Sequence, residues 1–383
     1  MQFPLVNFLF ERGSRPASSK EETAALQYME NQFKTMNLDT RQISFPSFRN
    51  KFCYNAIAYA LFPLASILYL DNHWTALLLA SIGIILLRLD IVIWPWVNRL
   101  FSWFSHSKSI TGRLRSRREP MRTFVITANV DSPIVPPRFL RWRYREVFNI
   151  YFLYVVDFLR VLQWLAFLIA PAFSFFNARE YVQMIWRLSL FPSILCLLVA
   201  GAYLFMDLYG VYLNCANDNL SGLRVLLDIV DELQREPLER VEVILAATGA
   251  GNAGMLGAHF LFEELNLHEE QVSVLHLKSI GSGRIVMVGS EGWSRGIYAS
   301  DDLADLGYLV GSTSERALEV WEKRQRRSDA SVARSAGYQA LSIIGVEKNG
   351  YPEFLSAGHI MEDNLIYVKN IVIQMMRTVD HEV

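Results

Sequence analysis

The sequence predicts an α/β sandwich with a mixed, largely parallel central sheet, into which four transmembrane helices are inserted as two hairpins. Two observations predict this fold. Excess apolarity is confined to two blocks of the chain, and outside these blocks strand patterns alternate with helix patterns. Of the 383 residues, 52% are hydrophobic and 20% are charged, which excludes a disordered or collagen-like chain.

Charge and cysteine content exclude further classes. Lys and Arg number 37 against 38 Asp and Glu, a net charge of −1, so no nucleic-acid partner is expected. Cys53, Cys196 and Cys215 lie far apart and without metal-ligand spacing. We therefore expect buried free thiols in a reducing compartment and no disulfide framework.

The first apolar block is the expected hairpin 52–96, in which Asp71-Asn72-His73 separates two apolar runs. The second is 148–208, with runs at 149–173 and 184–208. Each run approaches the roughly 20 residues that cross a bilayer, and the first begins too far from residue 1 for a cleaved signal peptide. The competing interpretation is two buried hairpins in the core of a soluble protein.

The distribution of basic residues predicts orientation in a cell membrane. The stretch between the hairpins is rich in arginine, whereas the hairpin tips carry only Arg179. By the positive-inside bias, we expect the soluble domain and both termini to be cytoplasmic. The basic run 113–122 either contacts anionic lipid or is a solvated loop. Tryptophans near this face suit an interfacial belt: Trp94, Trp96, Trp103 and Trp142.

One charged pair falls inside the third expected span. Asp157 and Arg160 are three residues apart and so share a helix face. Charges at that depth pair with each other or face protein. A proton or ion path is one interpretation, and an internal ion pair that fixes helix packing is the one we favour.

The hairpins divide the remaining chain into three pieces that we expect to form one domain: 1–51, 97–147 and 209–383. Helix patterns occur at 20–36, 221–236, 254–265 and 366–379. Strand patterns occur at 41–47, 121–130, 241–248, 271–277, 284–288 and 340–346. This alternation favours helices packed on a largely parallel sheet.

Chemistry in such sheets lies at the carboxyl ends of the strands. The polar loops found there are, in order, NVDS at 129–132, NDNLSG at 217–222, TGAGNAGMLGAHF at 248–260, LKSIG at 277–281, SDAS at 328–331 and HIMED at 359–363. Their order resembles the M28 family of co-catalytic zinc aminopeptidases, which includes relatives that have lost catalysis. The resemblance covers nearly all of the chain outside the hairpins and implies an M28 peptidase-like fold.

The same resemblance implies that the metal site is degenerate. The family's five ligand positions fall on Asn129, Asp218, Asn252, Lys278 and His359, its general-base position on Gly251, and the histidine of its SDH loop on Ala330. Among the ligand positions only Asp218 and His359 keep a metal-binding side chain, with Asp131 beside them, and the general-base position is Gly251. A catalytic zinc needs about three protein ligands and a nearby base for its water. We therefore expect no catalytic residue and no cofactor, with zinc only if the degenerate site still binds it.

Without a metal, a semi-buried Asp218 would lack a counter-charge, which is costly. We expect Lys278 to pair with Asp218 in place of the zinc centre. The alternative is that Lys278 points to solvent. A rebuilt metal site from Asp218, His276 and His359 would instead make the chain a membrane-bound metallo-aminopeptidase.

A second alternative comes from GAGNAG at 249–254, a GxGxxG pattern between a strand and a helix. Gly249, Gly251 and Gly254 would then bind NAD(P), but the next strand leads into Lys278 instead of an acidic residue. The six ordered loops outweigh this short pattern. We therefore expect a catalytically inactive M28-like multi-pass protein, with a residual cleft at Asp131, Asp218, Lys278 and His359. It would act as a structural, assembly or interaction subunit with another membrane protein or complex.

Overall fold

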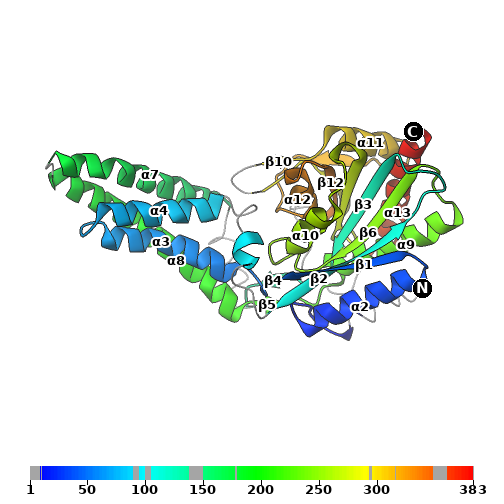
Figure 1. Ribbon diagram of the computed structural model, residues 1–383, viewed down its shortest axis with the longest axis horizontal. Coiled ribbons are helices and arrows are strands. Elements are labelled where there is room, and N and C mark those ends of the chain that lie inside the picture. The colour runs from blue at the N-terminus through cyan, green and yellow to red at the C-terminus, as the bar shows by residue number, and fades with distance from the viewer. Residues whose placement is uncertain are drawn as a thin grey trace. The chain divides into compact units, whose positions relative to one another are not determined.

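The computed structural model describes Leu9 and residues 11–88, 95–99, 105–137, 150–176, 179–292, 296–314, 316–347 and 360–382. The chain divides into two compact units (Figure 1). Unit 1 comprises Met1–Arg49, Asn98–Pro133 and Tyr212–Val383, and unit 2 comprises Asn50–Val97 and Ile134–Val211. Each unit is described by itself.

Unit 1 is built on an eight-stranded sheet of order β1-β2-β6-β3-β7-β12-β8-β11. Its strands are β1 (Asp39–Pro46), β2 (His106–Leu114), β3 (Arg122–Asn129), β6 (Val241–Thr248), β7 (Val272–Lys278), β8 (Arg284–Val288), β11 (Glu319–Trp321) and β12 (Gln339–Val346). Among these strands, four neighbouring pairs are parallel and three antiparallel. The expected mixed, largely parallel sheet is confirmed. Short strands outside this sheet are β4 (Ile134–Val135) paired with β5 (Val211–Tyr212), and β9 (Ser290–Glu291) paired with β10 (Ile297–Tyr298).

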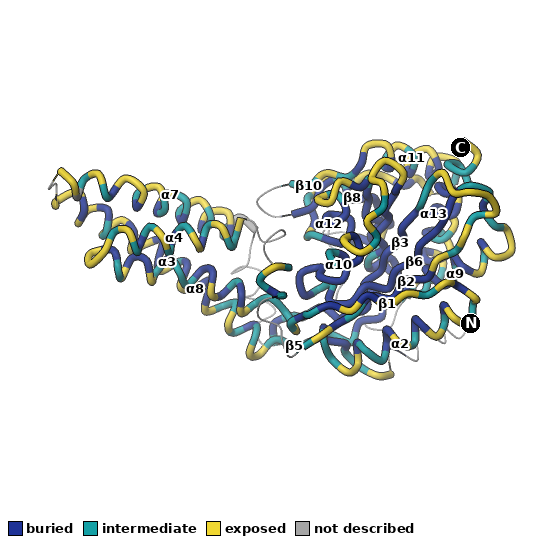
Figure 2. Tube along the Cα trace, viewed as in Figure 1, coloured by how far each residue is buried: buried dark blue, intermediate teal, exposed yellow. Residues whose placement is uncertain are grey.

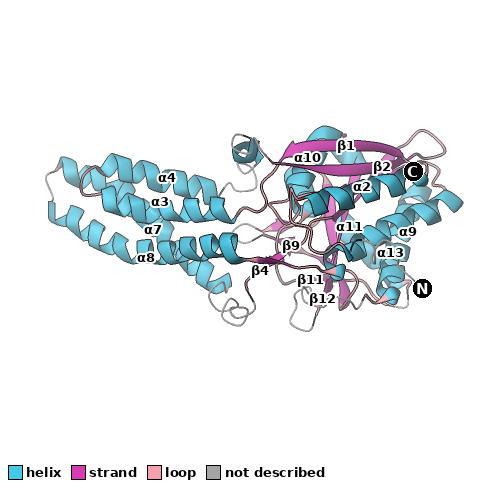
Figure 3. Ribbon diagram, turned by 90° about the horizontal axis from the view of Figure 1, so that it is seen from below, coloured by secondary structure: helices cyan, strands magenta, loops and turns pink. Residues whose placement is uncertain are grey.

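Helices cover both faces of this sheet (Figure 3). They are α2 (Lys20–Thr35), α9 (Ser221–Arg235), α10 (Leu256–Leu265), α11 (Asp301–Ser312), α12 (Asp329–Ser335) and α13 (Glu362–Glu382), with short turns η2 (Ala216–Leu220) and η3 (Glu269–Gln271). The main core lies between the sheet and α2, α9, α11 and α13, and α10 and α12 contact β2, β6, β7 and β12. Every residue of β6 is buried, since helices cover both faces (Figure 2).

The chain passes from unit 1 to unit 2 and back at the edge of the sheet where β1 and β3 end and β2 begins. Pro46, the end of β1, is the cross-strand partner of His106, the start of β2. Asn129, the end of β3, is likewise paired with Thr248, the end of β6. The turn between β2 and β3, which carries the basic run 113–122, lies at the opposite edge, where β6 begins.

Unit 2 contains a helical bundle of α3 (Phe52–Leu68), α4 (His73–Arg88), α7 (Ile150–Phe175) and α8 (Arg179–Tyr209), with α3 against α4 and α8, and α7 against α4 and α8. Large apolar side chains point outward, including Ile67 at 70% and Leu188 at 66% exposure. Within the described residues, two stretches are long and apolar enough to cross a membrane, Phe152–Phe173 and Arg179–Tyr209. The first hairpin has shorter apolar helices, so the length criterion is met by two of the four expected spans.

Candidate functional site

The loops singled out in the sequence converge where β3, β6 and β7 end. Strand β3 lies between β6 and β7 and is parallel to both, so their carboxyl ends meet at one edge. Asn129 ends β3, Lys278 ends β7, and Gly249 follows β6. Asp218 comes from η2, and the peptide bond that joins it to Asn219 is cis.

Asp218 is fully buried, and neither of its carboxylate oxygens accepts a hydrogen bond from a described residue. The Lys278 Nζ lies 3.8 Å from Asp218 Oδ1 and donates to Asn252 Oδ1 at 3.2 Å. Burial raises the pKa of the Asp218 carboxyl, and the positive charges of Lys278 and Arg15 act in the opposite direction. Lys278 therefore faces into the site and not into solvent, with its side chain 20% exposed.

Asp131 holds the turn that follows β6. Its carboxylate accepts hydrogen bonds from the backbone N–H groups of Gly251 at 2.8 Å and Asn252 at 2.7 Å, and from Asn129 Nδ2 at 3.2 Å. Asn252 Nδ2 in turn donates to the Asp131 carbonyl at 2.9 Å. Burial raises the pKa of Asp131 to about 6, although these hydrogen bonds favour the ionised form.

Glu22 of α2 is a second carboxylate that binds the same turn, and no sequence motif singled it out. From the first turn of α2 it accepts hydrogen bonds from Ala250 N at 2.7 Å, Ser18 N at 2.7 Å and Ser107 Oγ at 2.8 Å. Burial, followed by the nearby charge of Asp131, raises its pKa to about 8. The backbone N–H groups of residues 250, 251 and 252 are thus all bound to carboxylates.

This arrangement argues against the dinucleotide alternative at Gly249, Gly251 and Gly254. A phosphate-binding turn offers free backbone N–H groups to an anion, whereas here Glu22 and Asp131 occupy them. A pyrophosphate would have to displace two carboxyl groups that lie in its place. In addition, β3 separates β6 from β7 in the sheet, so the strand–helix–strand unit that contains the glycines does not join adjacent strands.

Gly251, at the family's general-base position, is closely packed. A Cβ atom added to Gly251 would lie 2.5 Å from Asn129 Cβ and 3.1 Å from Asp131 Oδ1. Asn129 is itself fixed, because its Oδ1 accepts from Asn219 Nδ2 at 3.3 Å. The backbone of this turn therefore has no room for any side chain at position 251.

His276 takes part in a different network. Its Nδ1 lies 2.9 Å from Thr127 Oγ1 and 3.6 Å from Asp329 Oδ2, and Asp329 accepts from Thr248 Oγ1 at 2.7 Å. Burial lowers the pKa of His276 to about 4. A rebuilt site that combines His276 with Asp218 finds no support in these contacts. His359, the other proposed member, lies outside the described residues.

The side chains in place do not fit a co-catalytic zinc pair. The described family positions offer one carboxylate, Asp218, together with the amides Asn129 and Asn252, the ammonium of Lys278, and Ala330. The two unpartnered oxygens of Asp218 suit a cation, but the cation beside them is Lys278. Across the described part of the chain, no group of three or more His, Cys, Asp or Glu side chains is arranged to hold a metal.

Comparison with known proteins gives a family match for one segment of the chain. Residues 206–380 match the model of peptidase family M28, which covers Asp218, Gly251, Asn252, Lys278 and His359. The match covers just under half of the chain, and over that segment the chain is similar to peptidase family M28. No curated protein matches the chain.

Solved structures show the same M28-like fold. A leucine aminopeptidase precursor from Bacteroides thetaiotaomicron is 12% identical, with 97% of this chain and 93% of that chain covered and a TM-score of 0.55. A glutaminyl cyclase from the same organism, bound to N-acetylhistamine, is 11% identical, with 97% and 94% covered and a TM-score of 0.55. An aminopeptidase from Aneurinibacillus sp. strain AM-1 is 14% identical, with 98% and 92% covered and a TM-score of 0.54.

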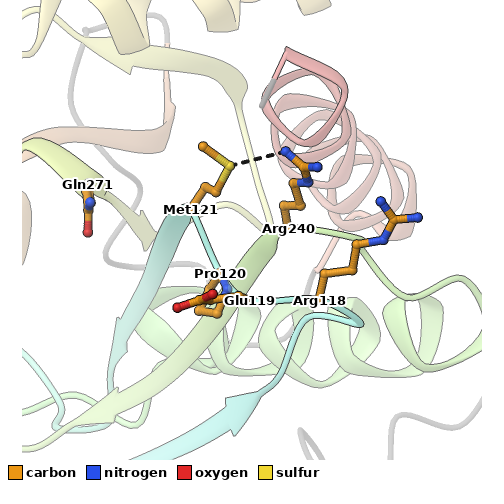
Figure 4. Close-up of a pocket in the computed structure, with 6 residues that line it drawn as sticks. All are labelled: Arg118, Glu119, Pro120, Met121, Arg240 and Gln271. Atoms are coloured by element: carbon orange, nitrogen blue, oxygen red, sulfur yellow. Dashed lines mark hydrogen bonds between the residues drawn. The ribbon is translucent and has the colours of Figure 1, made fainter.

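Several arginines of the basic run 113–122 have acidic partners in unit 1. Arg113 pairs with Glu242 at 2.6 Å, and Arg117 and Arg118 both pair with Glu239 at 3.1 and 3.2 Å. A hollow of about 420 Å³ lies at this edge, lined by Arg118, Glu119, Pro120, Met121, Arg240 and Gln271 (Figure 4). Contact of this run with anionic lipid stays a prediction.

Proposed function

We propose that this chain is a membrane-anchored, M28-like protein that does not hydrolyse peptides, and that its folded domain serves as a binding or assembly surface for another membrane protein. One observation carries the proposal: the ammonium of Lys278 lies within reach of both Asp218 and Asn252, at positions that the family resemblance assigns to metal ligands.

The chemistry of water activation explains why this observation matters. A zinc ion lowers the pKa of its bound water only when about three protein ligands hold the metal, and a base must then accept the proton. A lysine ammonium carries one charge and, unlike a metal ion, has no coordination position at which water could bind. Gly251 has no side chain that could act as the base, and its close packing on Asn129 leaves no room for one.

Membrane anchoring rests on unit 2. Helices α7 and α8 have the length and apolarity of membrane spans, and α3 and α4 pack against them as a second apolar hairpin. We propose that all four helices are embedded in the cell membrane. The arginine-rich stretch between the hairpins favours a cytoplasmic M28-like unit.

A membrane-bound metallo-aminopeptidase is the competing function, and solved proteins of this fold include aminopeptidases and glutaminyl cyclases. That likeness concerns the fold alone. The substituted residues of this chain are what favour loss of hydrolysis. None of the described contacts favours the metallo-aminopeptidase, because the only carboxylate at the ligand positions has a lysine beside it.

The test is hydrolysis by the purified chain in mild detergent, with zinc supplied. We expect no turnover of aminoacyl or N-terminal glutaminyl substrates, and stoichiometric co-purification of a membrane protein. Turnover that is lost in Asp218→Ala, but kept in the surface variant Asp231→Ala, would overturn the proposal. Asp231 is an exposed acidic residue on α9 and so controls for loss of a negative charge alone.

A further inference from the structure

The interior of unit 2 contains a polar cluster that joins both hairpins. Gln163 of α7 donates through Nε2 to Ser66 Oγ of α3 at 2.9 Å and to Ser193 Oγ of α8 at 3.0 Å. The hydroxyls of Ser66 and Ser193 are 2.8 Å apart, and those of Ser66 and Ser189 are 2.9 Å apart. All four side chains are buried.

Arg160 lies one turn before Gln163 on the same face of α7 and is 1% exposed. Its Nη2 pairs with Asp157 Oδ1 at 3.2 Å, and its guanidinium carbon lies 5.4 Å from the centre of the Tyr59 ring. Within the described part of the chain, its Nε and Nη1 groups have no hydrogen-bond partner. A buried N–H without a partner destabilises the folded state, and it does so more strongly on a charged group.

The buried polar atoms without hydrogen-bond partners near Arg160 include both donors and an acceptor. Gln163 Oε1, an acceptor, also lacks a partner, whereas Arg160 Nε and Nη1 are donors. Toward the tip of the first hairpin, Tyr69 Oη and His73 Nδ1 are buried without partners, and their rings are 4.7 Å apart. The core of unit 2 thus holds five buried polar atoms that have no hydrogen-bond partner among the described residues.

The charge of the Arg160–Asp157 pair, together with the mixture of free donors and acceptors, indicates what kind of molecule could bind Arg160 and Gln163. Asp157 already neutralises Arg160, so an anion would add an uncompensated charge inside an apolar bundle. The partner is therefore neutral, and it must accept from Arg160 and donate to Gln163. Water does both, and buried waters typically make about three hydrogen bonds to such groups.

We propose that unit 2 contains an internal hydration site in which bound water bridges the Arg160 guanidinium and the Gln163 carbonyl oxygen. The site lies where the first hairpin, through Ser66, meets the second, through Gln163 and Ser193. Bound water satisfies the free donors of the Arg160 guanidinium in the interior of this helical unit. This inference does not depend on the proposed loss of hydrolysis.

The test uses the full chain, labelled with ¹⁵N-arginine, in lipid bilayers. Solid-state NMR measures magnetisation transfer from water protons to each arginine Nε. Arg15 is an internal dry reference: it is 0% exposed, and its Nε donates to the Val130 carbonyl at 3.0 Å. We expect the Arg160 Nε signal, assigned by its loss in Arg160→Lys, to gain water magnetisation several-fold faster than that of Arg15.

A matched pair of variants tests the shared partner. Gln163→Leu removes the acceptor, so transfer to Arg160 should fall toward the level of Arg15. Ser81→Ala, which removes only the hydroxyl bonded to Trp164 at 2.9 Å, should leave it unchanged. Transfer to Arg160 as slow as that to Arg15 in the unsubstituted protein would overturn the proposal, and so would unchanged transfer in Gln163→Leu.

Discussion

The Lys278 ammonium lies 3.8 Å from the Asp218 carboxylate, and Asp218 is buried without any other described hydrogen-bond or ion-pair partner. Lys278 ends β7 and Asp218 belongs to η2, so the pair joins two of the loops that converge at the carboxyl edge of the sheet. A single positive charge on a side chain thus lies where the family resemblance places the charge of metal ions.

Removal of the lysine charge should destabilise unit 1. Lys278→Met leaves a buried carboxylate without a counter-charge, so we expect a loss of about 3 kcal/mol in the free energy of unfolding. Asp218→Asn/Lys278→Met should recover most of that loss, which denaturant unfolding of the four proteins in a double-mutant cycle would measure. Additive effects of the two substitutions would show that the side chains do not interact.

A glutamate introduced at residue 251, the family's general-base position, should not restore hydrolysis. Gly251→Glu forces a Cβ atom to 2.5 Å from Asn129 Cβ, and overpacking of this kind costs about 1–3 kcal/mol. We expect a lower unfolding midpoint and no hydrolysis. Gly201→Ala is the control, because an added Cβ there meets no atom within 4 Å. A Gly251→Glu protein as stable as the parent would show that the turn adapts easily.

The carboxyl groups of Glu22 and Asp131, which bind the turn after β6, should make the free energy of unfolding fall as pH rises. Burial raises the pKa of Glu22 to about 8 and that of Asp131 to about 6. The folded state therefore keeps protons that the unfolded chain releases, so this contribution is complete below about pH 4 and disappears as pH approaches 8. Unfolding midpoints between pH 5 and 8 measure it. Glu22→Gln should flatten the slope, and an equal slope in that variant would contradict the assignment.

His276 should act in the opposite direction at acid pH. Burial lowers its pKa to about 4, so the folded state holds the neutral ring. Its contribution is complete above about pH 6.5 and is lost as pH falls toward 4, because the unfolded chain takes up the proton first. An NMR titration of the His276 ring should give a midpoint near 4. A midpoint near 6.5 would mean that the ring reaches solvent.

The sequence alone was enough to predict the strands and helices whose buried side chains are apolar. Strands β3, β6 and β7 were predicted because their apolar runs follow from burial on both faces of a parallel sheet. Strand β2 was missed because its buried side chains include Ser107, Ser109 and Thr111, so it has no apolar periodicity. Its place between β1 and β6 follows from backbone pairing that the sequence does not encode locally.

The site was only partly predictable for the same reason. Asp218 and Lys278 were selected through ordered loop motifs, and the structure places them near each other. Glu22 was not selected, because an acidic residue in a first helical turn is usually exposed. It is buried only because Ser107 and Ala250, 85 and 228 residues away, come together above it.

The most direct test of the central claim is the zinc content of the purified chain, after incubation with zinc and removal of free metal. Because Lys278 lies where a metal would bind and Asn252 offers only an amide at a ligand position, we predict far less than one zinc per chain, with no change in Asp218→Ala. One or two zinc ions per chain, lost in Asp218→Ala, would contradict the account.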